Sequence, residues 1–297
     1  MNILVTGGTG FIGRKVCRAL VSSGHQVIVF SRNPEKVAKL IGHACLGVGD
    51  IAPENFKEPV DAIINLAGEP IADSRWTEAR KAKLRDSRIG TTQKIVELCA
   101  ALNPPPKVLI SASAVGYYGD QGDNEVTEST SPHKEFTHLL CLDWEQKAME
   151  AQQFGVRVVV ARFGLVVGKG GFLKKMLTPF KLGVGGKLGD GKQWMPWIHV
   201  QDLVHILLYF MEHDTCEGAY NAVSPSPVTN EEFTRILGEV VGRPTLFSVP
   251  KIVLESTLGE MARLLLTGQK ALPYRLMENE AFVFNYDKLE DALRDVV

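Results

Sequence analysis

Three glycines near the start of the chain have a spacing that suits a bound diphosphate. Gly7, Gly10 and Gly13 follow an apolar run over residues 2–6 and open a segment with helical periodicity over residues 11–22. In such a unit the first glycine permits a tight turn, the second lets the backbone approach a pyrophosphate, and the third lets the helix pack closely on the strand. The helix N-terminus then attracts the negative charge. The motif predicts dinucleotide binding by Gly7, Thr9, Gly10, Phe11, Ile12 and Gly13. A plain tight turn is the alternative.

The residues after the second expected strand, 26–30, indicate which dinucleotide binds. An NAD site usually presents Asp or Glu to the ribose 2′-hydroxyl about 20 residues after the glycines. This chain has Ser31 and Arg32 there and no acid. Because a carboxylate repels a 2′-phosphate whereas a guanidinium and a hydroxyl bind one, we expect NADP(H). The alternative is that Arg32 is a solvated charge at the end of a strand.

The elements that position these residues alternate between strand and helix over the first half of the chain. Further strands are expected at 44–48, 61–66, 108–111 and 156–162, and helices at 34–40, 78–102 and 135–152. Strands that are apolar on both faces and separated by helices indicate a parallel sheet covered on both sides. The sequence therefore predicts an α/β fold with a Rossmann-type, doubly wound parallel sheet.

The pattern changes after residue 164. Residues 168–193 are rich in glycine and lysine, so a loop over a site is expected, with a disordered surface loop as the alternative. Short strands and three helices follow, at about 201–213, 230–241 and 252–266. We therefore expect an NADP-binding domain over 1–165, to which later strands return. A smaller, mainly helical substrate lobe with a C-terminal extension is expected over 166–297.

Composition narrows the classes of partner. With 33 Lys plus Arg and 34 Asp plus Glu, the formal net charge is −1, which argues against broad binding to DNA or RNA. No run approaches the about 20 apolar residues of a membrane span, and the N-terminus lacks the features of a secretory signal. The five cysteines are scattered, and His133 and His138 have no partner at metal-ligand spacing. A cytoplasmic location and no bound metal are therefore expected.

Seven short motifs, taken together, are specific for a protein family. They are TGGTGFIG (6–13), NLAGEPI (65–71), SRIGTTQ (87–93), GYYGD (116–120), DWE (143–145), MPWIHVQDL (195–203) and GQKALP (268–273). With them the chain resembles the extended short-chain dehydrogenase/reductase superfamily, and within it the atypical "epimerase family protein" group, which carries a short C-terminal extension. The resemblance covers nearly the whole chain. It implies an NADP(H)-binding protein with a small-molecule substrate, and a homodimer through the long helices, but it supplies no specific reaction.

The resemblance also implies further cofactor contacts. In the superfamily, the segment after the fourth strand lines the ribose and nicotinamide of the cofactor. Here that segment is Leu66, Ala67 and Gly68. Arg88, within SRIGT, is expected to reach the cofactor as well, with a plain helix-surface charge as the alternative.

The catalytic residues of the superfamily are a Ser or Thr, a Tyr, and a Lys four residues after the Tyr. The Tyr is the acid or base, and the Lys lowers its pKa and holds the nicotinamide ribose. The expected helix 135–152 contains no such Tyr–Lys pair. When Glu145 is matched to the acid that usually follows the Lys, the Tyr position is Thr137 and the Lys position is Cys141. Neither side chain does the same work unaided.

Other residues are therefore needed for catalysis. Ser113 is preferred to Ser111 as the serine, because its spacing to Tyr117 mimics the superfamily pattern if one residue is inserted. An ungapped match places Ala114 at the serine position instead. Tyr117 and Tyr118 are the candidates for a substitute acid, and the alternative is that both rings pack the loop.

Two functions follow from these observations. The preferred hypothesis is an NADP(H)-dependent oxidoreductase or epimerase-like enzyme with a nonstandard acid. The second is a noncatalytic NADP(H)-binding sensor or regulatory protein. The missing Tyr–Lys pair favours the sensor, whereas the expected loop over a site and the IHVQD segment (198–202) favour the enzyme.

Overall fold

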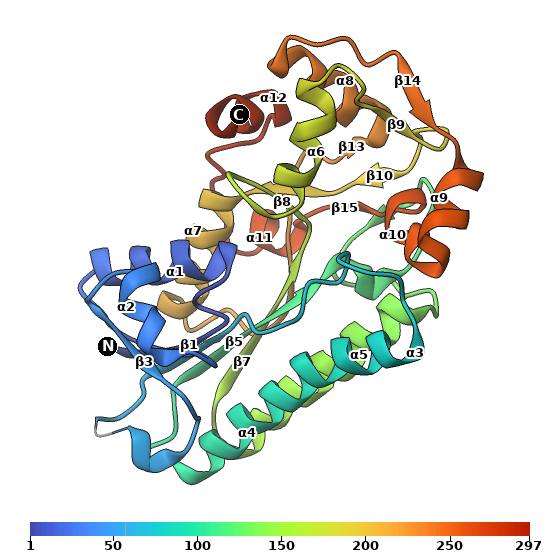
Figure 1. The fold of residues 1–297 in the computed structure, drawn as a ribbon. Coiled ribbons are helices and arrows are strands. Elements are labelled where there is room, and N and C mark those ends of the chain that lie inside the picture. Colours follow the sequence, from blue (N-terminus) through green and yellow to red (C-terminus); the bar gives the residue numbers. More distant parts are fainter. Residues whose placement is uncertain (57) are drawn as a thin grey trace.

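A seven-stranded parallel sheet forms the core of the molecule (Figure 1). The computed structural model describes residues 1–56 and 58–297. The sheet has the strand order β12–β7–β5–β4–β1–β2–β3. Its strands are β1 (Asn2–Thr6), β2 (Gln26–Phe30), β3 (Cys45–Val48), β4 (Ala62–Asn65), β5 (Val108–Ala114), β7 (Arg157–Phe163) and β12 (Gly218–Ala222). All pairings are parallel, and the chain winds outward from β1 in both directions. The predicted Rossmann-type, doubly wound fold class is therefore confirmed.

Helices cover both faces of this sheet. α1 (Phe11–Ser22), α2 (Val37–Leu40) and α7 (Val200–Glu212) bury apolar side chains against one face. α4 (Thr91–Ala101) and α5 (Phe136–Met149) do so against the other. α3 (Glu78–Arg85) leads into α4 through a π-helical turn over Asp86–Gly90. Figure 1 shows that α4 and α5 run side by side below the sheet.

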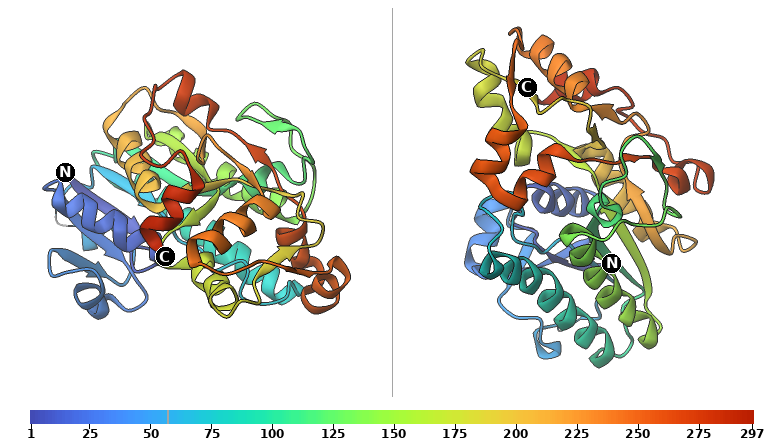
Figure 2. Two further views of the ribbon diagram at one scale, coloured as in Figure 1. Left: turned by 90° about the horizontal axis from the view of Figure 1, so that it is seen from above. Right: turned by 90° about the vertical axis from the view of Figure 1, so that its right-hand side faces the viewer.

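A smaller lobe lies at the carboxyl end of the strands and has a core of its own (Figure 2). Its helices are α6 (Gly171–Lys181), α8 (Asn230–Val241), α9 (Lys251–Leu258), α10 (Arg263–Leu266), α11 (Tyr274–Glu278) and α12 (Leu289–Val296). Its short strands pair two by two: β8 (Leu165–Val167) with β11 (Trp197–His199), β9 (Gly186–Leu188) with β14 (Phe247–Val249), β10 (Trp194–Met195) with β13 (Val228–Thr229), and β15 (Lys270–Ala271) with β6 (Glu125–Val126). The core packs α6, α8 and α12 around the fully buried Trp197.

Two expectations for the second half of the chain were wrong. Residues 168–193 are not a continuous loop, because α6 occupies Gly171–Lys181. Apolar residues recur there at helical spacing, and the glycines gather at the two ends of the segment rather than within it. The single helix expected over 252–266 is broken after α9, at Gly259, whose φ of +61° ends the helix.

Two further observations concern the described residues as a whole. No helix among them is long and apolar enough to cross a membrane. The five cysteines are all buried and unpaired.

Candidate functional site

The glycine turn between β1 and α1 is packed too closely to hold larger residues. Gly7 has a φ of +66°, and a Cβ there would lie 2.4 Å from the carbonyl oxygen of Leu66. A Cβ on Gly13 would lie 2.2 Å from the carbonyl oxygen of Gly7. Gly10 is exposed, and its N–H donates to the carbonyl oxygen of Gly7 at 3.0 Å. The first and third positions therefore require glycine, and the second keeps the surface of the turn open.

The N-terminus of α1 has the properties of an anion site. Its N-cap is Gly10, which has no side chain to accept hydrogen bonds, and its first turn holds no acidic residue. The backbone N–H groups and the helix dipole therefore remain available to a phosphate. Thr9 and Ile12 are half-buried at this end. The ring of Phe11 packs against Gly168 and Gly170, where the lobe begins. The turn thus fits the pyrophosphate of a dinucleotide.

Ser31 and Arg32 follow β2 directly, beside the glycine turn. The hydroxyl of Ser31 accepts a hydrogen bond from the N–H of Asn33 at 3.1 Å. The Arg32 side chain is 86% exposed, and its guanidinium lies 3.6 Å from a carboxylate oxygen of Glu69. Because β1 lies between β2 and β4 in the sheet, this ion pair spans the end of β1. The Arg32 guanidinium therefore lies exposed at the end of β1, beside the turn.

A row of buried polar side chains crosses the carboxyl end of the sheet. Thr6, Asn65 and Ser111 are register partners on β1, β4 and β5. The Thr6 hydroxyl donates to Asn65 Oδ1 at 2.6 Å, and Asn65 Nδ2 donates to the hydroxyls of Thr92 and Ser111 at 2.9 and 3.2 Å. This network holds the end of β4, and with it the segment Leu66–Gly68, in place beside the turn.

Arg88 contacts this segment from the turn between α3 and α4. Its guanidinium donates to the carbonyl oxygens of Leu84 and Glu69 at 3.1 Å each. A Cβ on Gly68 would lie 3.1 Å from the guanidinium carbon, so glycine there makes room for it. Burial lowers the pKa of Arg88 below its usual value. The structure thus places Arg88 against the segment that the resemblance assigned to the cofactor.

A second row of buried polar side chains, which we name the arginine row, lies two residues further along the strands. Ser113, Arg162 and Asn221 are register partners on β5, β7 and β12. Glu145 of α5 accepts from the Ser113 hydroxyl at 2.6 Å and from Arg162 through two hydrogen bonds of 2.9 and 2.8 Å. Although burial alone would lower the pKa of Arg162, the carboxylate of Glu145 outweighs it and raises that pKa.

The two candidate tyrosines have different surroundings. Tyr118 is fully buried; its hydroxyl accepts from Arg162 at 2.8 Å and donates to Asn221 at 2.7 Å. Burial raises the pKa of Tyr118 to about 12, although Arg162 opposes that rise. Tyr117 is half-buried, and the guanidinium carbon of Arg162 lies 3.5 Å from its ring centroid. Among the described residues, the Tyr117 hydroxyl makes no hydrogen bond. Tyr118 is thus part of the arginine row, and only Tyr117 has a free hydroxyl.

The positions matched to the missing Tyr–Lys pair are buried against the same strand end. The thiol of Cys141 lies beside Ser113 and Ala114. Burial raises the pKa of this thiol to about 11, and the negative charge of the nearby Glu145 is the second cause of the rise. Thr137 packs on Gly116 and donates to Glu135 at 3.1 Å. The guanidinium of Arg162 belongs to the same cluster, because it and the Ser113 hydroxyl both donate to Glu145.

The IHVQD segment anchors the C-terminal region. His199 is the N-cap of α7, and the fully buried Asp202 accepts hydrogen bonds from the N–H of Asn285, the Asn285 amide and the N–H of Tyr286, at 3.0, 2.8 and 2.9 Å. Trp197 is fully buried in the lobe core, and Trp194 donates to Asp123 at 3.0 Å. These residues hold the lobe to the sheet.

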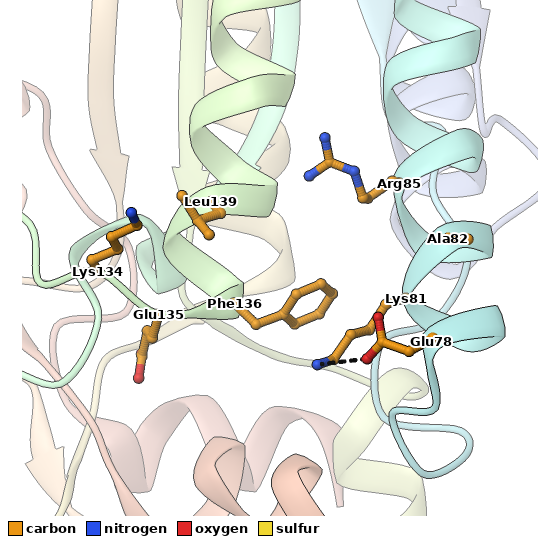
Figure 3. Close-up of a pocket in the computed structure, with 8 residues that line it drawn as sticks. All are labelled: Glu78, Lys81, Ala82, Arg85, Lys134, Glu135, Phe136 and Leu139. Atoms are coloured by element: carbon orange, nitrogen blue, oxygen red, sulfur yellow. Dashed lines mark ion pairs between the residues drawn. The ribbon is translucent and has the colours of Figure 1, made fainter.

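A groove of about 620 Å³ lies between α3 and the start of α5, and Figure 3 shows its walls. Its cations are Lys81, Arg85 and Lys134. Lys81 pairs with Glu260 at 2.6 Å, and Arg85 pairs with Asp143 at 2.5 Å. None of the residues predicted for the site lines this groove.

The sequence motifs did not indicate Glu145, Arg162 and Asn221 as members of the site. A signal was available, because an arginine within an apolar strand must be paired when the strand is buried. Strand register, which the sequence does not display, determines that its partners come from α5, β5 and β12.

Comparison with protein families assigns both parts of the chain. The model "NAD dependent epimerase/dehydratase family" matches residues 3–222, which include the sheet from Ile3 onward and all the site residues predicted from the sequence. A domain of unknown function, DUF1731, matches residues 249–296, the C-terminal part of the lobe.

Individual relatives match over their whole length. The epimerase family protein YfhF of Bacillus subtilis is 38% identical over 100% of this chain and 98% of its own. The epimerase family protein SDR39U1 of mouse is 37% identical, covering 100% of both. The crystal structure of human SDR39U1 (isoform 2) with NADPH superimposes with a TM-score of 0.90 at 34% identity, over 100% of this chain and 99% of that one. The chain therefore belongs to the NAD dependent epimerase/dehydratase family, among the epimerase family proteins of the short-chain dehydrogenase/reductase type.

Proposed function

We propose that the protein is an NADP(H)-dependent oxidoreductase or epimerase-like enzyme that acts on a small molecule. The observation that carries the proposal is the glycine turn with the uncapped N-terminus of α1, placed beside Ser31 and Arg32. The human relative was crystallised with NADPH, which supports the same cofactor here. The substrate itself is not identified by these features.

Each part of the turn has a role in holding the cofactor. The backbone N–H groups at Thr9–Gly13 bind the pyrophosphate. Ser31 and Arg32 bind the 2′-phosphate, because a hydroxyl and a guanidinium both donate to phosphate oxygens. Leu66, Ala67 and Gly68 line the ribose, and Arg88, which packs on Gly68, reaches the cofactor beside this segment. When bound, the cofactor supplies hydride donor or acceptor capacity.

Tyr117 is the residue that we propose as acid. Its hydroxyl has no hydrogen-bond partner among the described residues, and the Arg162 guanidinium carbon lies 3.5 Å from the centroid of its ring. Ser113 is bound to Glu145, and it positions the arginine row rather than donating a proton to substrate. Tyr118 is held in the same way by Asn221 and Arg162.

A noncatalytic NADP(H) sensor is the second candidate. The observation that favours it is the pair of residues at the usual Tyr and Lys positions. Thr137 is a very weak acid, and the buried Cys141 thiol carries no charge at neutral pH because its pKa is raised to about 11. The same glycine turn serves both candidates, so binding alone does not separate them.

Cofactor binding is tested by thermal-shift titration with NADPH and NADH in parallel. A ligand at about 100 times its dissociation constant adds about 2.7 kcal/mol of stability. We expect a clearly larger shift with NADPH. Equal shifts would remove the 2′-phosphate argument, and no shift with either nucleotide, after bound nucleotide has been extracted, would overturn the proposal.

Chemistry is tested by following NADPH oxidation with a panel of carbonyl compounds. Turnover that falls in Tyr117→Phe while NADPH binding is kept supports the enzyme and its acid. Full turnover in Tyr117→Phe would exclude Tyr117 as the acid. A protein that binds NADPH tightly and turns over no carbonyl compound favours the sensor.

Two further predictions concern the setting of the protein. A cytoplasmic location follows from the scattered cysteines, and a homodimer through the long helices is typical of the superfamily. Cell fractionation and sedimentation analysis would test them.

A further inference from the structure

One carboxylate near the glycine turn is surrounded by three cations. Glu69 follows Gly68 after β4, and its side chain is 19% exposed. Its Oε1 lies 3.6 Å from Arg32 Nη1, and its Oε2 lies 3.5 Å from Arg80 Nη1 and 3.8 Å from Lys83 Nζ. Three positive charges against one negative charge leave a local excess that a further anion would neutralise.

Arg80 contributes a second and independent observation. Its side chain is 13% exposed, and its Nη2 donates to the carbonyl oxygen of Pro70. Its Nη1 reaches Glu69 only at 3.5 Å, the outer limit of a hydrogen bond. Its buried Nε has no hydrogen-bond partner among the described residues. A buried donor without a partner is costly and uncommon, which indicates that an acceptor absent from the protein itself belongs there.

The position of this cluster relates it to the nucleotide. Arg32 follows β2, Glu69 follows β4, and β1 with its glycine turn lies between those strands. Arg80 and Lys83 are three residues apart, so they share the face of α3 that approaches Glu69. The hydroxyl of Ser87, four residues after Lys83, accepts a hydrogen bond from the backbone N–H of Glu69 at 3.0 Å. The cations of α3 thus face Arg32 across the end of β1.

We propose that Arg80 and Lys83 complete, with Arg32, the subsite for the 2′-phosphate of NADP(H). This inference rests on the proposed function and adds two residues from outside the strand ends to it. Glu69 is the resident counter-ion of the cluster and keeps the three cations together. Because these cations outnumber its single negative charge, the cluster attracts a phosphate despite the repulsion from this carboxylate. A phosphate between them accepts hydrogen bonds from the donors that Glu69 leaves unused, including Arg80 Nε.

The alternative is that the cluster only ties α3 to the loop after β4. Exposed ion pairs contribute little to stability, and Lys83 is 61% exposed. Ion pairs that only attach α3 to this loop would not make the protein bind NADPH more tightly than NADH. The two interpretations therefore differ in one measurable quantity, the ratio of the affinities for NADPH and NADH.

The experiment measures dissociation constants by titration calorimetry for NADPH and NADH. The variants are Lys83→Gln, Arg80→Gln and the control Arg85→Gln. Arg85 lies on the same helix but points into the groove toward α5 (Figure 3) and pairs with Asp143. Adenosine 2′,5′-bisphosphate and AMP, which differ only in the 2′-phosphate, serve as a second pair of probes.

We expect Lys83→Gln and Arg80→Gln each to weaken NADPH about tenfold, the effect of losing one charge-assisted contact, and to leave NADH unchanged. The affinity for adenosine 2′,5′-bisphosphate should fall as much as that for NADPH, and the affinity for AMP should stay unchanged, as for NADH. Arg85→Gln should change neither. Because Lys83 is largely exposed, its variant is expected to fold even if Arg80→Gln does not.

The outcomes separate this inference from the proposed function. If wild-type protein prefers NADPH but Lys83→Gln keeps the full preference, or loses both nucleotides equally, the subsite is wrong and the proposed function stands. If wild-type protein binds NADPH and NADH equally, the 2′-phosphate subsite fails as a whole. If it binds neither, the proposed function itself fails.

Discussion

The glycine turn and the arginine row lie at the same edge of the sheet, but they differ in what they leave available. At the turn, the α1 N-terminus has no capping side chain, and on α3 the Nε of Arg80 has no hydrogen-bond partner among the described residues. In the arginine row, Glu145, Arg162, Tyr118 and Asn221 bind one another. The difference teaches that the first region leaves hydrogen-bond donors for a ligand, whereas the second satisfies its own polar groups and holds its own shape.

The largest expected effect comes from opening the arginine row. Glu145→Ala leaves the buried Arg162 without its carboxylate, which should lower the free energy of unfolding by about 3–5 kcal/mol. Urea denaturation measures this loss. As a matched control, adding Arg162→Met to Glu145→Ala should recover part of it, because no unpaired charge then remains. A loss below about 1 kcal/mol for Glu145→Ala, the range of exposed pairs, would contradict the importance of this pair.

The next effect comes from filling the glycine turn. A side chain on Gly13 would overlap the carbonyl oxygen of Gly7, 2.2 Å from its Cβ. Gly13→Val should therefore cost about 1–3 kcal/mol of stability by overpacking, and it should weaken NADPH and NADH together. Gly90→Ala is the control, since a Cβ there meets nothing within 4 Å. Wild-type affinity in Gly13→Val, measured by titration calorimetry, would show that the turn does not bind the pyrophosphate.

The two neighbouring tyrosines give a smaller and sharper contrast. Tyr118→Phe leaves Asn221 Oδ1 and Arg162 Nη1 each without its hydrogen-bond partner, which should cost about 1–3 kcal/mol. Tyr117→Phe removes a hydroxyl that has no partner among the described residues, so its stability should stay within about 0.5 kcal/mol of wild type. Urea denaturation of both variants tests the pair. Equal losses of unfolding free energy in the two variants would mean that both hydroxyls have similar surroundings.

The smallest effect is a pH dependence confined to high pH. The pKa of Tyr118 is raised from 10.0 to about 12 in the folded protein, so folding favours its protonated form. Its contribution to stability is complete below pH 10 and is lost as the pH rises toward 12. The difference in unfolding free energy between wild type and Tyr118→Phe should therefore shrink over that interval. A constant difference would mean that Tyr118 is not held in its protonated form by folding.

Local patterns predicted the sheet and its helices well. The expected helix 11–22 coincides with α1, and the expected strands 2–6 and 26–30 coincide with β1 and β2. The loop expected over residues 168–193 was wrong, because the high glycine content of the whole segment outweighed the helical spacing of the apolar residues within it. Strand β5 extends to Ala114 and thus includes Ser113, which was expected to follow the strand.

The sequence by itself determined the fold class and the position of the glycine turn, because glycine spacing and apolar periodicity act between residues close along the chain. Only the tertiary structure decided which side chains meet. Ser113, Arg162 and Asn221 become neighbours through the register of β5, β7 and β12. Arg80 approaches Arg32 through Glu69, because α3 packs beside the loop that follows β4. Pairing of this kind joins residues distant in sequence, and its energy depends on burial, which no local pattern specifies.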